Sequence, residues 1–223
     1  MPLSKKVAVF VLGLPGSGKS SLVRRLSLQS NFTQVSIGCL LRKLLEQNQN
    51  NEDTRVAKEV ILQGTSTPYS LVVRLIKQEL AGKPLKNIVF DGYPRDAVQL
   101  TNLENLLSEL DFSYQTITGV WLDACETLIK ERLHKRVICS KCGNPSENSS
   151  SVCSICNGSL IQRLDDTQIQ SIHSRISWFN SNVKPVIQSF ESNYSLLHIP
   201  ACHNKELILN KVITYLNNTE LIN

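Results

Sequence analysis

The chain has 223 residues, of which 41% are hydrophobic and 19% are charged, and its formal net charge is +5. This composition is typical of a globular protein and excludes a disordered chain. No run reaches the ~20 apolar residues of a membrane-spanning helix, so we expect no membrane partner. The positive charge suits a phosphate-rich ligand but is too small and too scattered to indicate nucleic acid by itself. The length allows one sizeable core with small inserted lobes, so we expect a single domain over residues 1–223.

The first predicted element is a strand over residues 7–12, and the six residues before it leave no room for a signal peptide. We therefore expect a cytoplasmic protein. The strand leads into Gly13-Leu14-Pro15-Gly16-Ser17-Gly18-Lys19-Ser20, which has the G-x-x-x-x-G-K-[ST] spacing of a phosphate-binding loop. Glycines let such a loop turn its N–H groups toward phosphate oxygens, and the helix expected from about Lys19 adds the positive end of its dipole. Lys19 can reach terminal phosphates and Ser20 can ligate Mg²⁺, so the loop predicts a nucleotide site.

The rest of the chain alternates apolar runs with helical patterns, which indicates an α/β fold with a parallel sheet and crossover helices. Further strands are expected at residues 33–37, 87–90, 117–122 and 196–199. Helices are expected at residues 40–45, 54–62, 69–80, 100–110, 125–134 and 205–216. A longer helix is expected over residues 166–190, bent or interrupted at Pro185 because proline cannot donate to the helical hydrogen-bond pattern.

Four of the seven cysteines form a doubled motif, Cys139-x2-Cys142-x10-Cys153-x2-Cys156. Paired C-x-x-C turns in a short segment are a strong indication of tetrahedral zinc, because each turn presents two thiolates on one side. Four thiolates leave no open position for water, so we expect one structural Zn²⁺. Disulfides are the alternative, but they are rare in a chain without an export signal. Cysteines used as small apolar residues would not explain the doubled spacing in a polar segment.

A second motif, Asp91-Gly92-Tyr93-Pro94-Arg95, follows a predicted buried strand. With the phosphate loop and an arginine-rich insertion, it makes the chain resemble the nucleoside monophosphate kinases, and among them the adenylate kinases that carry a zinc-bearing lid. The resemblance extends from Val7 to about Leu216. It implies Mg²⁺-dependent, reversible phosphoryl transfer, ATP + AMP = 2 ADP, on a five-stranded parallel sheet with flanking helices. It also implies an inserted acceptor-binding lobe at about 36–70 and a lid at about 132–170, and we expect a monomer.

The resemblance assigns roles to individual residues of this chain. Catalytic roles fall on Lys19, Arg95, Arg132, Arg163 and Arg175. ATP binding falls on Gly13, Pro15, Gly16, Ser17, Gly18, Lys19, Ser20, Ser21, Arg132 and Lys135. AMP binding falls on Ser36, Ile37, Arg42, Thr65, Thr67, Gly92, Arg95, Gln99, Arg163 and Arg175. Ser20 and Asp91 would hold Mg²⁺, and Asp165 and Asp166 match a hinge pair of the lid. These roles suit the chemistry, because phosphoryl transfer to an anionic acceptor needs positioning and charge neutralisation more than a general base.

The chain departs from the family pattern at several positions. Ser20-Ser21 replaces Gly-Thr after the loop lysine, and either hydroxyl could serve, with Ser20 favoured by the general motif. Ser36-Ile37-Gly38-Cys39 replaces Ser-Thr-Gly-Asp, and Lys135 replaces an arginine that contacts donor phosphates, which keeps the charge but loses the bidentate fork. The interval from Arg163 to Arg175 is one residue longer than usual. Pro200-Ala201-Cys202-His203 replaces a segment with Asp-Gly that contacts the donor adenine.

Two other functions stay open on the sequence. One is a related kinase with a different donor or acceptor base, although Gln99, four residues after Arg95, favours AMP. The other is a non-catalytic nucleotide-binding protein or a zinc-ribbon nucleic-acid binder. Such a binder should interleave basic and aromatic residues around its metal turns. Lys141 is the only basic residue between Cys139 and Cys156, and there is no aromatic residue. We therefore expect ATP and AMP as partners and no nucleic acid.

Overall fold

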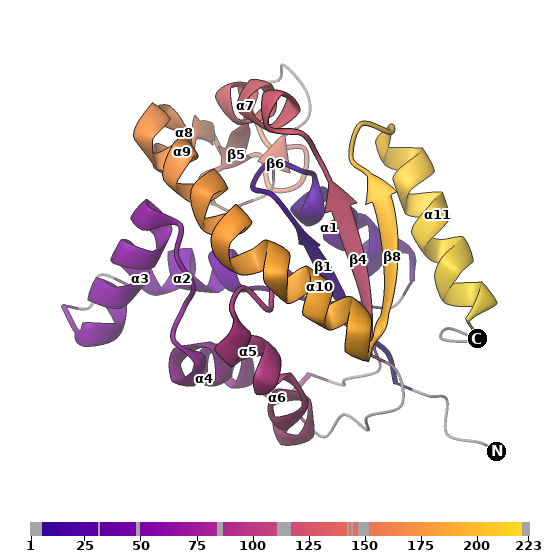
Figure 1. Ribbon diagram of the computed structural model, residues 1–223. Coiled ribbons are helices and arrows are strands. Elements are labelled where there is room, and N and C mark those ends of the chain that lie inside the picture. The colour runs from indigo at the N-terminus through magenta and orange to yellow at the C-terminus, as the bar shows by residue number, and fades with distance from the viewer. Residues whose placement is uncertain are drawn as a thin grey trace.

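A five-stranded parallel sheet forms the centre of the computed structural model (Figure 1). The structure describes residues 6–30, 32–47, 50–83, 87–110, 117–141, 143, 145–146 and 152–219, without the side chains of residues 164 and 165. The strand order is β2-β3-β1-β4-β8, and every neighbouring pair is parallel. The strands are β1 (Ala8–Gly13), β2 (Phe32–Ser36), β3 (Asn87–Asp91), β4 (Ile117–Asp123) and β8 (Ser195–Pro200). The five predicted strands are confirmed, to within one residue at each end.

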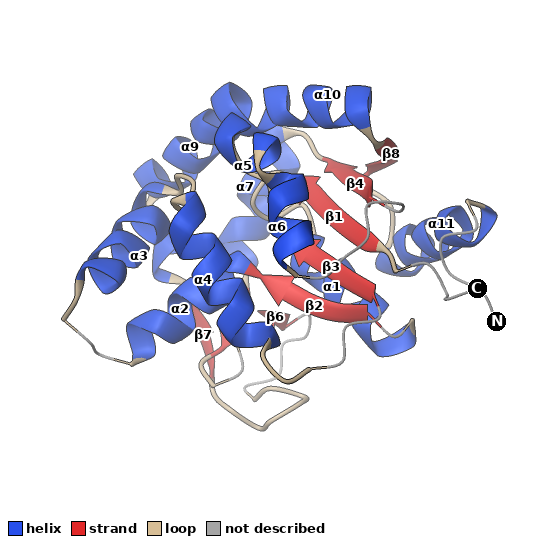
Figure 2. Ribbon diagram, turned by 90° about the horizontal axis from the view of Figure 1, so that it is seen from below, coloured by secondary structure: helices blue, strands red, loops and turns tan. Residues whose placement is uncertain are grey.

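Helices cover both faces of this sheet. Alternate residues of β1 point to opposite sides of the sheet, so they pack against different helices. Val9 and Val11 belong to a buried cluster with α1 (Lys19–Gln29) and α11 (Lys205–Asn218). Phe10 and Leu12 belong to a second, larger cluster on the other face. Figure 2 shows α11 on one side of the sheet and α10 on the other. The central strand is therefore buried on both faces, which explains its continuous apolar sequence.

The remaining helices lie in or around the larger cluster. They are α2 (Ile37–Glu46), α3 (Glu52–Gln63), α4 (Tyr69–Leu80), α5 (Ala97–Thr101), α6 (Leu103–Glu109), α7 (Glu126–Lys135), α8 (Leu164–Thr167), α9 (Ile169–Trp178), the π-helical turn η1 (Phe179–Val183) and α10 (Lys184–Asn193). Helix α3 ends one residue beyond its predicted end, and Gly64 follows it with a φ of 72°, the left-handed conformation that glycine adopts without strain.

The single helix predicted over residues 100–110 is wrong, because the structure has two helices there. Asp96 caps α5 by accepting a hydrogen bond from the N–H of Gln99, and Asn102 separates α5 from α6. The carbonyl of Val98 accepts hydrogen bonds both from the side-chain amide of Asn102 (2.8 Å) and from its N–H (3.1 Å). Asparagine favours such local bonds at helix ends, whereas the leucine pattern runs on through the break.

The predicted interruption of the long helix at Pro185 is misplaced. The chain is extended at Gln168, between α8 and α9, and the regular helix then changes to the π-helical turn η1 before the proline. Pro185 lies in the first turn of α10. The first N–H groups of a helix have no partner inside it, so proline is tolerated at that position.

A second, antiparallel sheet lies between α7 and α8, with the order β6-β5-β7. Its strands are β5 (Val137–Cys139), β6 (Pro145–Ser146) and β7 (Leu160–Gln162). The sequence analysis predicted no strands there, because the segment is polar and its strands are very short. Of the helices in the described ranges, none has the length and apolar character needed to span a bilayer.

Candidate active site

A cavity of about 680 Å³ opens at the carboxyl ends of the parallel strands, the usual ligand position in an open α/β sheet. Residues from the ends of β1, β2 and β3 line it, together with residues of α7 and of the segment 143–163. The predicted residues that line the cavity are Gly13, Pro15, Gly16, Ser17, Gly18, Lys19, Ser20, Ser21, Ser36, Ile37, Arg42, Thr67, Asp91, Gly92, Arg95, Arg132, Lys135, Arg163 and Arg175. Two predicted residues, Thr65 and Gln99, do not line it.

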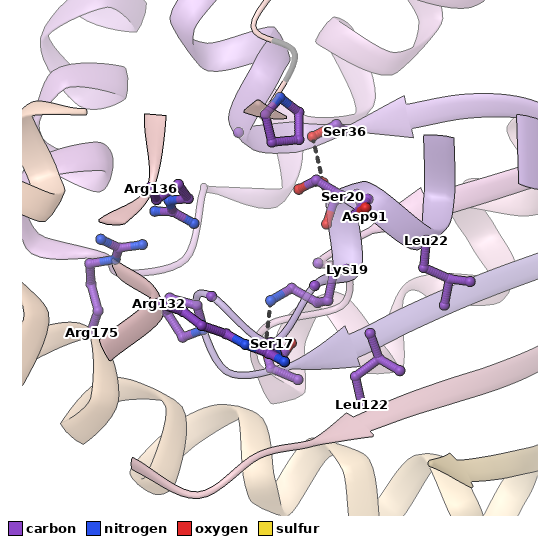
Figure 3. Close-up of a pocket in the computed structure, with 18 of the residues that line it drawn as sticks. Ser17, Lys19, Ser20, Leu22, Ser36, Asp91, Leu122, Arg132, Arg136 and Arg175 are labelled. Atoms are coloured by element: carbon purple, nitrogen blue, oxygen red, sulfur yellow. Dashed lines mark hydrogen bonds between the residues drawn. The ribbon is translucent and has the colours of Figure 1, made fainter. Parts of the chain in front are cut away.

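The loop between β1 and α1 has the geometry of an anion cradle. Gly13 has a φ of 144°, and a Cβ there would lie only 2.5 Å from the carbonyl oxygen of Leu122, so the close approach of β1 and β4 requires glycine. The Lys19 ammonium curls back and donates to the carbonyls of Gly13 (2.8 Å) and Leu14 (2.7 Å). The hydroxyl of Ser17 is buried and has no hydrogen-bond partner among the residues that the structure describes. This loop therefore presents donors that a phosphate could engage (Figure 3).

The site carries an excess of positive charge. Burial lowers the pKa of Lys19 to about 7, an effect that Asp91 opposes and that Arg95 and Arg136 reinforce. Burial also lowers the pKa values of Arg95 and Arg136 to about 10. These shifts come chiefly from the removal of the cations from water, and repulsion between neighbouring cations adds to them. Anionic ligands, such as the phosphates of two nucleotides, would relieve this repulsion.

Asp91, at the end of β3, is the acidic centre of the loop side of the cavity. Its Oδ2 accepts hydrogen bonds from Ser20 Oγ (2.6 Å) and Ser36 Oγ (3.1 Å), and Figure 3 shows the three side chains together. Carboxylate and hydroxyl oxygens beside a phosphate loop are the donor set that Mg²⁺ prefers. Mg²⁺ therefore fits these residues, and of the two candidate serines it is Ser20 that contacts Asp91.

The predicted arginines converge on the cavity from separate elements. Arg95 donates to the carbonyl of Gly64 (2.6 Å), which holds it against the end of α3. Arg132 donates to the carbonyl of Ala201 (2.9 Å), beyond β8. Arg163 and Arg175 also line the cavity, so the additional residue between them does not carry either one away from it.

Arg136 lines the same cavity and was missed by sequence reasoning. Its Nε and Nη2 both donate to the carboxylate of Asp166, each at 2.7 Å. The signal was present, since Arg136 lies four residues after Arg132, or about one helical turn. The sequence interpretation assigned the neighbouring Lys135 to the donor phosphates. Both side chains line the cavity, but Arg136 brings the bidentate fork that Lys135 lacks.

Comparison with known proteins identifies the family. A family model described as adenylate kinase matches residues 11–195. The chain belongs to the adenylate kinase family. It is 31% identical to an adenylate kinase of Thermococcus sibiricus over 82% of each chain, and 30% identical to one of Orientia tsutsugamushi over 92% of this chain and 96% of the other. An adenylate kinase of Acetivibrio thermocellus is 28% identical over 95% of this chain and 98% of its own length.

Gln99, expected to face the acceptor base, has both ends of its amide bonded to the protein. Its Oε1 accepts from the N–H of Arg95 (2.9 Å), and its Nε2 donates to the carbonyl of Thr67 (2.7 Å). The side chain is only 1% exposed. Gln99 therefore ties the segment that carries Arg95 to the segment after α3, and in this structure it supports the acceptor side of the cavity from behind.

Two departures from the adenylate kinase pattern also have structural consequences. Ile37 is buried at the start of α2 and gives the cavity an apolar side chain where the family has a hydroxyl. Cys39, two residues later, lies beside Gly143, which is between β5 and β6; a Cβ added to Gly143 would stand 3.8 Å from the Cys39 sulfur. The first helix of the expected acceptor lobe thus lies close to the expected lid at this point.

Three of the four predicted metal ligands meet in the second sheet. The sulfur atoms of Cys139, Cys153 and Cys156 all lie within 4.8 Å of one another, and Cys142 lies outside the described residues. The N–H groups of Lys141 and Ile155 point at the sulfurs of Cys139 and Cys153, both at 3.4 Å. Backbone donors stabilise thiolates, as second-shell bonds do in metal sites. The residues present therefore fit a thiolate-bound zinc ion.

Proposed function

We propose that this chain catalyses the reversible, Mg²⁺-dependent reaction ATP + AMP = 2 ADP in the cavity described above. The observation that carries the proposal is the meeting of Lys19, the Ser20–Asp91 pair and a ring of arginines in one cavity. Phosphoryl transfer requires two polyanions to be held in line and their charges neutralised. The cationic side chains and the loop amides supply both, and membership of the adenylate kinase family supports the choice of reaction.

The donor triphosphate occupies the loop side of the cavity in this proposal. The loop amides of Gly13 to Ser21 and the Lys19 ammonium bind its β- and γ-phosphates, and Arg132 and Lys135 contact it from α7. Ser20 and Asp91 hold Mg²⁺, which supplies charge neutralisation at the donor phosphates when bound. Lys19 leaves the carbonyls of Gly13 and Leu14 to reach the phosphate, a hydrogen-bond exchange that the charge of the ligand favours.

The acceptor occupies the other side, between α2, the end of α3 and the Asp91–Arg95 segment. Its phosphate binds Arg42 and Arg95, and its nucleoside lies beside Ser36, Ile37, Thr67 and Gly92, with Thr65 and Gln99 supporting that wall. Arg163 and Arg175 close on the transferring group. An acceptor phosphate is anionic at neutral pH, so the transfer needs no general base.

A structural zinc ion completes the proposal. We assign it to Cys139, Cys142, Cys153 and Cys156, supported by the convergence of the three described thiols. The segment at about 132–170 acts as a lid, and the segment at about 36–70 as the acceptor-binding lobe. We further propose that the protein acts as a monomer and without nucleic acid.

A coupled assay with each of the four nucleoside monophosphates, and with ATP or GTP as donor, tests the proposal. AMP with ATP should give the highest kcat/KM, and activity should disappear in excess EDTA. Faster phosphorylation of CMP or UMP than of AMP at equal concentration would reject AMP as the acceptor and leave a monophosphate kinase of another specificity. No phosphorylation of any acceptor would reject the proposed reaction.

A further inference from the structure

The side of the cavity proposed for the acceptor base has an apolar wall. Helices α2 and α3 contribute Ile37, Leu41, Val60 and Ile61 to the lining, and Arg42 is the one charged side chain that these two fully described helices add to it. Ile37, Leu41 and Val60 also belong to the larger hydrophobic cluster, and Ile61 packs against that cluster. The wall is therefore continuous with the core. Its apolar side chains can pack against a flat ring but offer that ring no hydrogen bond.

Hydroxyl groups are few on this side of the cavity. Among the described residues from Ser36 to Thr67 and from Asp91 to Arg95, only Ser36 and Thr67 bring a hydroxyl to the lining. The hydroxyl of Ser36 donates to Asp91 (3.1 Å), the carboxylate that we assign to Mg²⁺. Thr67 therefore carries the one hydroxyl of these segments that could bond the edge of an acceptor base.

The amide of Gln99 is occupied by the protein itself. Its Oε1 accepts from the N–H of Arg95 (2.9 Å), and its Nε2 donates to the carbonyl of Thr67 (2.7 Å). The guanidinium of Arg95 also donates to the carbonyl of Gly64 (2.6 Å), so three hydrogen bonds join the same two segments. Gln99 is 1% exposed and does not line the cavity. To bond a base, its amide would have to give up two hydrogen bonds that it already makes.

We propose that this acceptor site selects its base by size and apolar contact and does not read the 6-amino group of adenine. Its substrates therefore include purine riboside 5′-monophosphate, the analogue of AMP that lacks this group. The inference rests on the proposed function, because it places the acceptor base against this wall. A site that bonds a polar group of its substrate rejects the analogue without that group strongly, whereas an apolar pocket discriminates weakly. A 6-amino group without a partner would also lose its water without compensation.

The first test compares acceptors on the unmodified protein with ATP as donor. We expect kcat/KM for purine riboside 5′-monophosphate to lie within about threefold of the value for AMP. The value for CMP should be at least ~10-fold lower, because the smaller ring leaves part of the apolar wall uncovered. A loss of more than tenfold on removal of the 6-amino group would overturn the inference, and so would equal use of CMP and AMP.

The second test asks whether either polar side chain reads the base. Gln99→Ala and Thr67→Val are each assayed with AMP and with purine riboside 5′-monophosphate. If neither side chain bonds the 6-amino group, each variant should change the KM values of the two acceptors by the same factor, to within about twofold. A variant that weakens AMP tenfold or more beyond the analogue would overturn the inference. The matched control is Gln188→Ala, an exposed glutamine of α10 outside the cavity, which should leave both KM values unchanged.

These outcomes can be told apart from failure of the proposed function. If the protein converts ATP and AMP to ADP but uses the analogue more than tenfold less well, only the apolar selection is wrong. If it phosphorylates no acceptor, the proposed reaction is wrong and the inference fails with it. Calorimetric titration with each acceptor alone measures affinity without turnover, and the two dissociation constants should agree within about threefold. Should Gln99→Ala fail to fold, the unmodified protein and Thr67→Val still decide the matter.

Discussion

Replacing Lys19 with methionine should abolish most activity and at the same time stabilise the ligand-free protein. The substitution removes the charge that reaches the terminal phosphates, and we expect kcat/KM to fall at least ~100-fold, on the order of 3 kcal/mol of transition-state stabilisation. The stability effect follows from burial, which lowers the pKa of the Lys19 ammonium from 10.5 to about 7.

The size of the stability gain follows from that difference in pKa. At about 1.4 kcal/mol per pKa unit, the charged form of Lys19 is disfavoured by roughly 5 kcal/mol in the folded protein. Because the folded-state pKa lies below the unfolded one, this cost is full below about pH 7 and disappears as the pH rises toward 10.5. Methionine loses the two hydrogen bonds to Gly13 and Leu14, worth about 1 kcal/mol each. The variant should therefore be more stable by about 2–3 kcal/mol at pH 6 and nearly unchanged at pH 9.

Urea unfolding of both proteins at pH 6 and pH 9 measures this difference, and the coupled assay measures the loss of activity. Lys130→Met is the matched control, because that side chain is 45% exposed and makes only a loose pair with Glu126. It should alter neither property by more than about 0.5 kcal/mol. A Lys19→Met protein that is less stable than the original at pH 6, or that retains full turnover, would refute the reasoning.

Three further predictions concern the acceptor wall and the metal. Arg95→Ala should lower kcat/KM for AMP by more than ~100-fold, because a desolvated phosphate loses a charged partner. An unchanged kcat/KM in steady-state kinetics would show that Arg95 does not bind the AMP phosphate. Gln99→Ala removes the hydrogen bonds to the N–H of Arg95 and to the carbonyl of Thr67. It should raise the KM for AMP by about 5–30-fold, equivalent to 1–2 kcal/mol. An unchanged KM would show that these two hydrogen bonds do not support the acceptor site. Cys153→Ser should lower both the zinc content and the melting temperature while some activity survives, because in the proposed site its sulfur binds the metal and touches neither nucleotide. Elemental analysis that finds no zinc in the unmodified, chelator-washed protein would reject the metal site.

The sequence was informative where one short segment determines both structure and chemistry. The loop from Gly13 to Ser20 is local, so its strand, its turn and its helix could all be predicted from spacing and glycine content. The same holds for β3 and the Asp91–Arg95 segment that follows it. The carboxyl ends of parallel strands lie at one edge of the sheet, so the position of these residues at one cavity followed from the fold class.

The features that were missed depend on contacts between distant segments or on small local choices of the backbone. The role of Gln99 rests on Thr67, 32 residues away, and that of Arg136 on Asp166, 30 residues away. Neither pairing has a signature in the spacing of either residue. The break at Asn102 and the π-helical turn before Pro185 interrupt apolar patterns that remain helical, so periodicity alone predicted continuous helices through them.

The most direct test of the central claim follows the phosphoryl group itself. ATP labelled in its γ-phosphate is incubated with unlabelled AMP, Mg²⁺ and the protein, and the nucleotides are separated before the reverse reaction mixes them. We predict that the label moves to the β-phosphate of ADP and that two ADP form for each AMP consumed. The Lys19→Met protein, which also controls for contaminating kinases, should form ADP at least ~100-fold more slowly. Label released as inorganic phosphate, or label transfer that the Lys19→Met protein supports equally well, would contradict this prediction.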